Sequence, residues 1–599
     1  MRLKENIERV IFEKQDAILK VIRFFMVLSS FGVLGVMVYR YGFNHTQINL
    51  DAINLNAKFF YFVFIISFSV RYFISSEKKQ YLINNLLELV LIGVVVFNYI
   101  CLLFLGYPFL EKMLMGLGIP NPTGIYHFLL QFILLCFVGI EFVKGINLIY
   151  SSTLKPTTLF LISFIVLILM GALLLSLPGF NTTGQYMNYV NALFTSASAC
   201  CVTGLTVENT ATFFNLKGQL VILFLIQMGG IGILTFASFF AGFIKKGIGI
   251  RHQFAMNQLL DTENLSGTTF LLKRILLMTF VIELIGAVGI YVLWGDYTFA
   301  NHGDRIYHSI FHSISAFCNA GFSTLEFGME TPLASELYML HIFMGFIIII
   351  GGIGFPVIRD VFSPIKLRQR LKEPWRDWNL SSKIAIYGSL ILITIGTVSF
   401  YFLHVKDLEH IKTPFGKFAV SFFQSVNTRT SGFSSINLNE MPTTLIMISM
   451  FLMFIGASSS STGGGIKTST FVIMMLAVLG TIKGKREMTL DKRTIGTDLI
   501  YKAFAVVVFS GLFVLSTITV LSFTENNMSL AALAYESISA FATVGLTTGI
   551  TPHLTDASKL VLVMSMFVGR VGVLSLAFSL SSRVNSSDNR YASTHLMIG

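Results

Sequence analysis

Four short polar segments of this chain share one pattern: an aromatic residue, a run of small and hydroxyl side chains, and a glycine ten residues after the aromatic. They begin at Phe194, Phe311, Phe422 and Tyr535 and end at Gly204, Gly321, Gly432 and Gly545, at intervals of 117, 111 and 113 residues. Glycine permits backbone conformations in which carbonyl oxygens occupy space that a side chain would otherwise fill. A ring of such carbonyls can replace the water shell of a potassium ion.

We therefore predict a K⁺ filter to which each segment contributes its glycine and the two residues before it. The alternative is four ordinary amphipathic hairpins that share composition by chance. The aligned aromatic, glycine and hydroxyl positions, repeated at a regular interval, favour internal repetition instead. The predicted ion-binding residues are Val202, Thr203, Gly204, Asn319, Ala320, Gly321, Thr430, Ser431, Gly432, Thr543, Val544 and Gly545.

The composition indicates an integral membrane protein. Hydrophobic residues make up 54% of the 599 residues, charged residues only 12%, and the mean hydropathy is +0.72. Soluble domains carry roughly 25% charged residues. The net charge of +12 comes from Lys and Arg between apolar runs, as expected of cytoplasmic loops, so we predict no nucleic-acid partner. The five cysteines include no CxxC pair and indicate neither a disulfide framework nor a zinc site.

The chain divides into two predicted regions. Residues 1–152 hold four candidate spans at 20–40, 57–76, 82–106 and 125–150, which we interpret as an accessory four-helix region. A voltage-sensor bundle is the disfavoured alternative, because the fourth span carries only Glu141 and Lys144 as charged residues. Residues 153–599 form the predicted pore domain.

The pore domain reads as four units of span, re-entrant loop and span. The first spans are predicted at 157–178, 275–294, 384–403 and 502–522, and the second spans at 219–243, 338–358, 444–479 and 560–580. The connections between the units are basic, and cytoplasmic loops carry an excess of Lys and Arg. We therefore predict that these connections and both termini lie in the cytoplasm and that the re-entrant loops face outside. The predicted fold is an all-α, polytopic protein of the cell inner (plasma) membrane, with one pseudo-fourfold pore.

The second span of the third unit is interrupted by a Gly/Ser run from Gly456 to Thr470. Broken backbone at membrane depth occurs only where protein or a water-filled cavity surrounds it. We predict a flexible intramembrane gate below the filter, and the open alternative is a cytoplasmic Gly/Ser linker. A phosphate-binding loop is rejected because Ile466 separates glycine from lysine. The predicted gate residues are Gly456, Ser459, Ser460, Gly463, Gly464, Gly465, Lys467 and Arg570.

Arg570 lies in an otherwise apolar span. An arginine at the bilayer centre costs about 2.5–3.5 kcal/mol on insertion scales, so it should face the interior of the bundle. We predict that its charge opposes cation passage below the filter; the alternative is an ion pair with Glu283. Arg429, inside the third segment, is expected to brace that loop by donating to carbonyls.

Taken in order, these motifs resemble the Trk/Ktr/HKT superfamily of potassium transporters, most closely the bacterial KtrB/TrkH-like pore subunits. The resemblance covers about residues 150–599 and rests on the four glycine segments, Ser-Thr-Gly-Gly-Gly-Ile-Lys467-Thr and Gly-Arg570-Val-Gly. It implies a homodimer with a cytoplasmic ring of TrkA/KtrA-like regulatory subunits that bind the nucleotide, and no cofactor in this chain. In this family glycine at the position of Gly204 goes with potassium selectivity. The Ser-Ser-Ser-Ser run and the N-terminal spans depart from the family pattern.

The predicted function is potassium uptake down the electrochemical gradient. Two alternatives remain: the ion-conducting subunit of an ATP-driven potassium pump, and a sodium-permeable cation transporter. An intramembrane enzyme is disfavoured, because the spans contain no HExxH motif, paired catalytic aspartates or nucleophile elbow.

Overall fold

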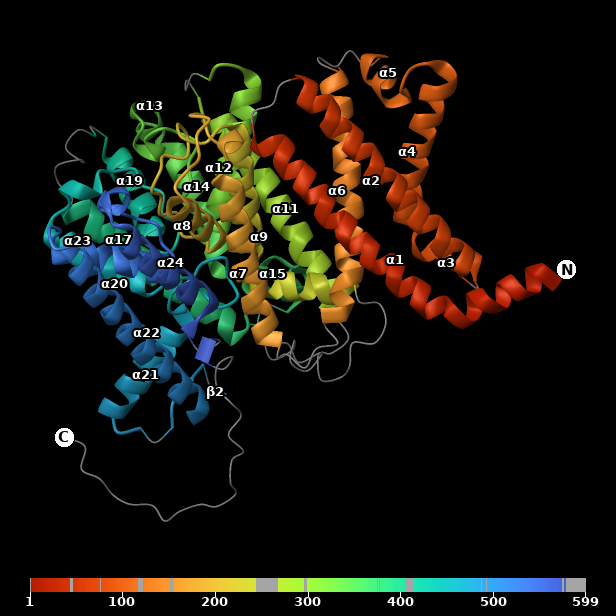
Figure 1. Cartoon of the computed structure of the whole chain (residues 1–599). Coiled ribbons are helices and arrows are strands. Elements are labelled where there is room, and N and C mark those ends of the chain that lie inside the picture. The colour runs from red at the N-terminus through yellow and green to blue at the C-terminus, as the bar shows by residue number, and fades with distance from the viewer. Residues whose placement is uncertain are drawn as a thin grey trace.

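The computed structural model describes residues 2–43, 47–75, 77–116, 122–149, 156–243, 268–295, 299–373, 375, 377–403, 411, 413–485, 487–491, 493–573 and 576–577. Within these ranges the chain is almost entirely helical (Figure 1), apart from a hairpin of β1 (Thr489–Leu490) and β2 (Arg493–Thr494). Seven of the described helices are long and apolar enough to cross a membrane, or eight if a bent pair counts as one span. The predicted all-α polytopic fold is confirmed.

The N-terminal helices pack beside the pore domain (Figure 1). They are α1 (Arg2–Gly42), α2 (Gln47–Ile74), α3 (Lys78–Asn84), α4 (Leu86–Leu105), α5 (Phe109–Gly116) and α6 (Pro122–Ile149). Their core includes Phe64 stacked on Phe137 at 5.1 Å, and Arg71 joins the two buried carboxylates of Glu88 and Glu141 at 2.7 and 3.1 Å. The first helix is longer than its predicted span, and the third predicted span divides at Asn85.

The pore domain contains four repeats. Their first spans are α7 (Pro156–Leu175), α11 (Thr268–Leu293), α17 (Leu380–Leu403) and α22 (Thr497–Thr524). The re-entrant pore helices are α8 (Tyr189–Cys200), α12 (His302–Cys318), α19 (Pro414–Asn427) and α23 (Leu530–Phe541). The second spans are α9 (Leu216–Phe243), α14 (Tyr338–Ile353) with α15 (Phe355–Phe362), α20 (Thr443–Phe454) with α21 (Thr468–Ile482), and α24 (Asp556–Val571).

Each pore helix begins at a side-chain N-cap. The oxygen of the capping side chain accepts a hydrogen bond from a backbone N–H of the first turn, which satisfies a donor that has no partner inside the helix. The four caps are Asn188, Asn301, Thr413 and Ser529. The start of each pore helix is therefore fixed by a side chain of the chain just before it.

The repeats close into a ring because the second span of each repeat packs on the pore helix of the next. The contacting pairs are α9 with α12, α14 with α19, α20 with α23, and α24 with α8. Apolar clusters follow the same order, since one core joins the first three repeats, another joins the third and fourth, and a third joins the fourth and first. This cyclic packing brings the four pore helices to one axis.

Two predicted second spans need correction. The second repeat was expected to cross continuously over 338–358, but α14 ends at Ile353 and α15 turns away by 105° at Gly354, whose φ is 98°. In the fourth repeat, predicted over 560–580, α24 ends at Val571 before Gly572 with φ 87°, and residues 574, 575 and 578–580 lie outside the described part of the chain. The predicted interruption of the third repeat is present between Phe454 and Thr468.

Candidate functional site

The four segment glycines meet in a closed ring. A Cβ atom built on Gly204 would lie 2.5 Å from the carbonyl oxygen of Ala320, and one built on Gly321 would lie 2.5 Å from that of Ser431. The Cβ of Gly432 would likewise strike the carbonyl oxygen of Val544, and the Cβ of Gly545 would strike that of Thr203. Each glycine thus leaves space for the carbonyl of the next repeat, and a side chain at any of the four would collide with it.

Two positions share a left-handed backbone conformation in every segment. The four glycines have φ between 69° and 94°, and the residue two positions before each also has positive φ: Val202 at 58°, Asn319 at 61°, Thr430 at 80° and Thr543 at 51°. A left-handed conformation is uncommon for any residue except glycine, and for β-branched residues it is a genuine outlier. Strain of this kind persists only where the surrounding structure imposes it, and it is concentrated at functional sites.

The pore helices take up the N–H groups of these segments. Thr203, Ala320 and Val544 donate their backbone N–H groups to the carbonyls of Ser198, Ser315 and Ser539, each at 2.8 Å. Within the described residues, no donor reaches the carbonyl oxygens of Thr203, Ala320, Ser431 and Val544. Carbonyl oxygens without a donor can bind a cation, and each of these four follows within a few residues of the C-terminal, negative end of a pore helix.

The third segment has a different register from the one that the sequence alignment suggested. Ser425 donates to Ile393 O at 2.7 Å, just as Ser196 donates to Ile168 O and Ser313 to Glu283 O. Counting from these serines, the buried aromatic that matches Phe194 is Phe423, and the predicted Phe422 is only partly buried. The third loop is therefore one residue shorter, and Ser431 N–H bonds to Asn427 O at 3.2 Å, four residues back rather than five.

A layer of fully buried polar side chains lies behind the ring, at the position after the buried aromatic: Thr195, His312, Gln424 and Glu536. In the second and fourth repeats this side chain contacts the extended segment that follows the glycine. Glu536 accepts from the hydroxyl of Thr547 and from that of Thr551 at 3.1 Å. His312 Nε2 contacts Ser323 Oγ at 2.9 Å. Sequence reasoning missed this layer, although an acid inside an apolar pore helix is a signal that could have found it.

The interrupted segment of the third repeat packs directly against the ring. Gly464 N–H donates to Thr543 Oγ1 at 3.0 Å, and a Cβ on Gly463 would strike the hydroxyl of Thr430. Thr462 Oγ1 reaches Phe317 O, at the end of the second pore helix, at 3.3 Å. The segment therefore contacts the third and fourth loops and the end of the second pore helix, on the side where the loops leave their pore helices.

The bend in the second repeat makes room for this segment. Ending α14 frees the carbonyls of Gly351 and Gly352, which accept from Thr462 N–H at 3.4 Å and from Ser458 N–H at 3.0 Å. Phe355 N–H, at the start of α15, donates to Ser460 O at 3.2 Å. Two broken helices thus satisfy each other's backbone groups, as membrane burial requires.

The remaining predicted gate residues divide into two groups. Gly456 and Gly465 pack together beside the bridge between Ile455 and Ile466, and Lys467 donates to Gly463 O at 2.6 Å. Ser459 is exposed instead and contacts Ser469 at 2.8 Å, so its side chain lies away from the ring.

Arg570 joins this segment to the first repeat. Its guanidinium is buried and donates to the carbonyls of Thr462 and Gly229. The alternative pairing with Glu283 is wrong, because Glu283 accepts from Gln227 at 3.1 Å and the described residues offer Arg570 no carboxylate within 4.0 Å. Among the described residues, the partners of the positively charged Arg570 and Lys467 side chains at this segment are therefore carbonyl oxygens and not carboxylates.

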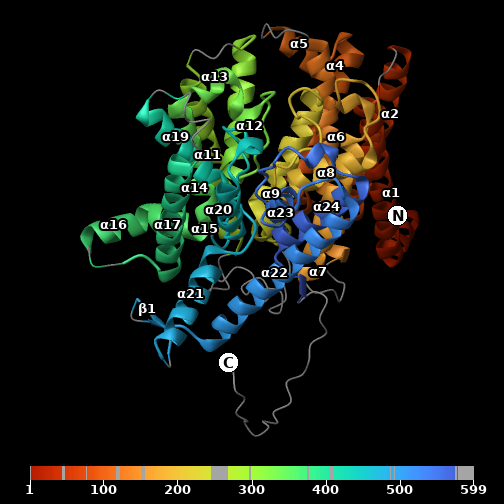
Figure 2. The same cartoon turned by 90° about the vertical axis from the view of Figure 1, so that its left-hand side faces the viewer.

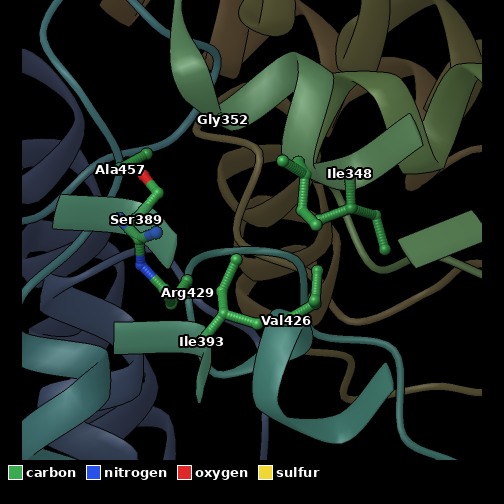
Figure 3. A pocket seen from close by; sticks show the side chains of 8 residues that line it. Ile348, Gly352, Ser389, Ile393, Val426, Arg429 and Ala457 are labelled. Atoms are coloured by element: carbon green, nitrogen blue, oxygen red, sulfur yellow. The ribbon is translucent and has the colours of Figure 1, made fainter. Parts of the chain in front are cut away.

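Arg429 connects the third loop to both ends of the interrupted segment. Its guanidinium donates to Gly456 O at 3.2 Å and to Thr468 Oγ1 at 3.0 Å, whereas its Nε has no partner among the described residues. It lines a cavity of about 20 Å³, enough for a water molecule. Figure 3 shows Arg429 and Ala457 on one side of this cavity and Ile348 on the other. The expected carbonyl brace exists, but it reaches the interrupted segment rather than its own loop.

Comparison with known proteins identifies the family of this chain. A family model described as TrkH, cation transport protein, matches residues 151–590. The chain is 36% identical over 445 residues to the potassium/sodium uptake protein NtpJ of Enterococcus hirae, an alignment that covers 73% of this chain and 95% of that protein. It is also 36% identical over 448 residues to the Ktr system potassium uptake protein B of Bacillus subtilis, covering 74% of this chain and 97% of that protein.

The fold is similar to a solved structure as well. The crystal structure of the potassium transporter TrkH from Vibrio parahaemolyticus has a TM-score of 0.59 and covers 82% of this chain and 97% of its own, at 17% identity. The family model spans well over half of the chain, and two relatives exceed 30% identity over nearly their whole length. This multi-pass membrane protein therefore belongs to the TrkH family of cation transport proteins.

Proposed function

We propose that this protein takes up potassium ions through the ring of Thr203, Ala320, Ser431 and Val544 carbonyls. One observation supports the proposal: each glycine makes room for the carbonyl of the next repeat, and four such carbonyls around one axis would form a cage of oxygens for one ion. Carbonyl oxygens can replace the hydration shell of K⁺. An inside-negative potential favours entry by about 2.3 kcal/mol per elementary charge for each 100 mV. The potassium uptake named for the Bacillus relative supports the choice of ion.

The interrupted segment is the proposed gate. Gly463 and Gly464 lie against two loops of the ring, so a cation leaving the ring would meet this segment next. Arg570 and Lys467 add two positive charges there. Opening requires the segment to move, and the Arg570 bonds to Thr462 and Gly229 must then break or rearrange.

The proposed assembly is a homodimer in the cell inner membrane, with both termini in the cytoplasm and the outer loops outside. A cytoplasmic TrkA/KtrA-like ring would bind the regulatory nucleotide, and this chain would supply the pore alone. Residues 1–152 would form an accessory unit docked on the first repeat, where Gly179 packs against the end of α1 at Tyr41 and Gly42.

Uptake of rubidium and of sodium by liposomes that contain the purified protein tests the proposed function. Rubidium uptake that exceeds sodium uptake and depends on an inside-negative potential would support a potassium pathway. Equal uptake of both ions would favour the second candidate, a sodium-permeable cation transporter, which the name of the Enterococcus relative supports. Co-purification with an ATP-driven pump subunit, with uptake that requires ATP, would overturn the proposal.

Glu536→Gln is expected to lower the rubidium-to-sodium uptake ratio by about tenfold, since a hydrogen bond to a charged group contributes about 1.5–3 kcal/mol and each 1.4 kcal/mol is tenfold. Glutamine already occupies the matching position as Gln424, so the substitution should fit. Glu525→Gln is the control, because Glu525 is a buried carboxylate at the end of α22 that accepts from Thr555 at the start of α24 instead of from Thr547 or Thr551. An unchanged ratio in Glu536→Gln would show that Thr547 and Thr551 do not need this carboxylate.

Thr468→Val is expected to raise rubidium leak through the closed protein by about tenfold, because Arg429 loses one of its two bonds to the gate and a bond to a charged donor contributes about 1.5–3 kcal/mol. Thr394→Val makes the same change on α17, where the hydroxyl donates to Leu390 O of its own helix. Rubidium leak measured in liposomes should rise in Thr468→Val and not in Thr394→Val. Equal leak in the two variants would show that the Arg429 bond to Thr468 does not help to keep the protein closed.

A further inference from the structure

A short helix projects from the pore domain at the base of the third repeat. After the 105° bend between α14 and α15, the chain continues into α16 (Pro364–Lys372) and reaches α17 only at Leu380. Figure 2 shows α16 extending sideways from the body, across the direction of α17. If α14 and α17 cross the bilayer, α16 lies along its surface.

A buried carboxylate holds α16 in this position. Asp360 of α15 is only 2% exposed and accepts from Lys366 Nζ at 2.6 Å and from Arg370 Nη2 at 3.1 Å. Its other oxygen accepts from Asn379 N–H at 3.0 Å and from Ser382 Oγ at 2.8 Å. One side chain therefore fixes α15, α16 and the start of α17 together, and the side of α16 with Lys366 and Arg370 faces the protein.

The opposite side of α16 is apolar and basic. Leu367 and Leu371 are 50% and 76% exposed, and their spacing of four residues places them on one face. Trp375, beyond the helix, is 79% exposed. The exposed Arg368 and Lys372 form a second stripe directly beside the leucines. Neither cation has an ion-pair partner within the described residues.

We propose that α16 binds the headgroups of anionic phospholipids at the membrane surface. A helix with one apolar and one basic stripe, lying in the membrane plane, buries its apolar side chains at the boundary of the acyl chains and keeps its cations among the headgroups. Tryptophan is enriched at this depth. In water the two cations would be hydrated, but Leu371 and Trp375 would stay exposed to solvent. At the surface of a neutral bilayer the apolar stripe would be buried, but the two cations would have no negative charge beside them. A leaflet that contains anionic lipid satisfies both stripes.

Tryptophan quenching in liposomes tests this proposal without any transport assay. The chain has three tryptophans, of which Trp294 is fully buried and Trp375 is highly exposed. The protein is reconstituted into one mixture of phosphatidylglycerol and phosphatidylcholine, with bromine carried by either lipid in turn. The signal of Trp375 is the difference between the wild-type protein and Trp375→Phe.

Brominated phosphatidylglycerol is expected to quench Trp375 more than brominated phosphatidylcholine does at equal mole fraction. Each basic residue near an anionic surface strengthens binding about fivefold, so Arg368→Gln with Lys372→Gln should lower the preference by about tenfold or more. Lys483→Gln with Lys485→Gln removes two other exposed cations and should leave the preference unchanged.

Two results would overturn the proposal. Equal quenching by the two brominated lipids in the wild-type protein would show membrane contact without recognition of anionic headgroups. Quenching by aqueous acrylamide and by neither lipid would place α16 in water, where a soluble acidic protein is the fitting partner. Neither result would bear on potassium uptake, which the liposome flux measurement tests separately.

Discussion

Serine in place of Gly204 is expected to lower the rubidium-to-sodium uptake ratio by at least about tenfold, which needs only about 1.4 kcal/mol. The serine Cβ would lie 2.5 Å from Ala320 O and 3.2 Å from the Cα of Gly321, so the ring must open on that side. The φ of 94° at this position adds backbone strain for any residue with a Cβ. Uptake by liposomes measures the ratio.

Gly106→Ser is the matched control for this experiment. Gly106 also has a left-handed conformation, with φ 75°, but no heavy atom of the described residues lies within 4 Å of a Cβ built there. The control therefore carries the strain without the collision, at the end of α4 in the N-terminal region. A Gly204→Ser protein that keeps the wild-type ratio would contradict a filter built from these carbonyls.

Arg570→Ala is expected to raise rubidium flux by about tenfold or more, because a positive charge beside the ion path opposes a passing cation and a repulsion of only about 1.4 kcal/mol corresponds to tenfold. The substitution also releases Thr462 O and Gly229 O, so the interrupted segment proposed as the gate loses its link to the first repeat. The initial rate of rubidium flux in liposomes that contain this protein without the regulatory ring measures the effect.

Arg570→Lys separates the two causes. Lysine keeps the charge but lacks the planar fork that reaches two carbonyls at once. A purely electrostatic barrier predicts nearly wild-type flux in Arg570→Lys, and a mechanical latch predicts flux close to that of Arg570→Ala. Unchanged transport kinetics in Arg570→Ala would contradict both roles.

The repeated architecture could be predicted from the sequence because its signals are local. Each signal can be read from a short stretch of sequence: the four glycine segments, the apolar spans and the interruption after Gly456. Together they predict the fold and the family. Positive φ at the glycines was also foreseeable, since only glycine adopts it without strain.

The features that the sequence did not predict depend on contacts between repeats. The bend at Gly354 exists because Ser458, Ser460 and Thr462 of another repeat bond to the backbone that it exposes. The one-residue shortening of the third loop is visible only when the Ser425 bond to Ile393 O is compared with its counterparts. The partners of Arg570 are backbone carbonyls, which carry no side-chain signature.

Locating the bound ion tests the central claim most directly. Crystals of the protein grown with rubidium, with diffraction data collected at the rubidium absorption edge, would show the ion by its anomalous signal. The account predicts a peak on the axis of the ring, within coordination distance of the carbonyl oxygens of Thr203, Ala320, Ser431 and Val544. Rubidium peaks that lie only away from these four oxygens would contradict it.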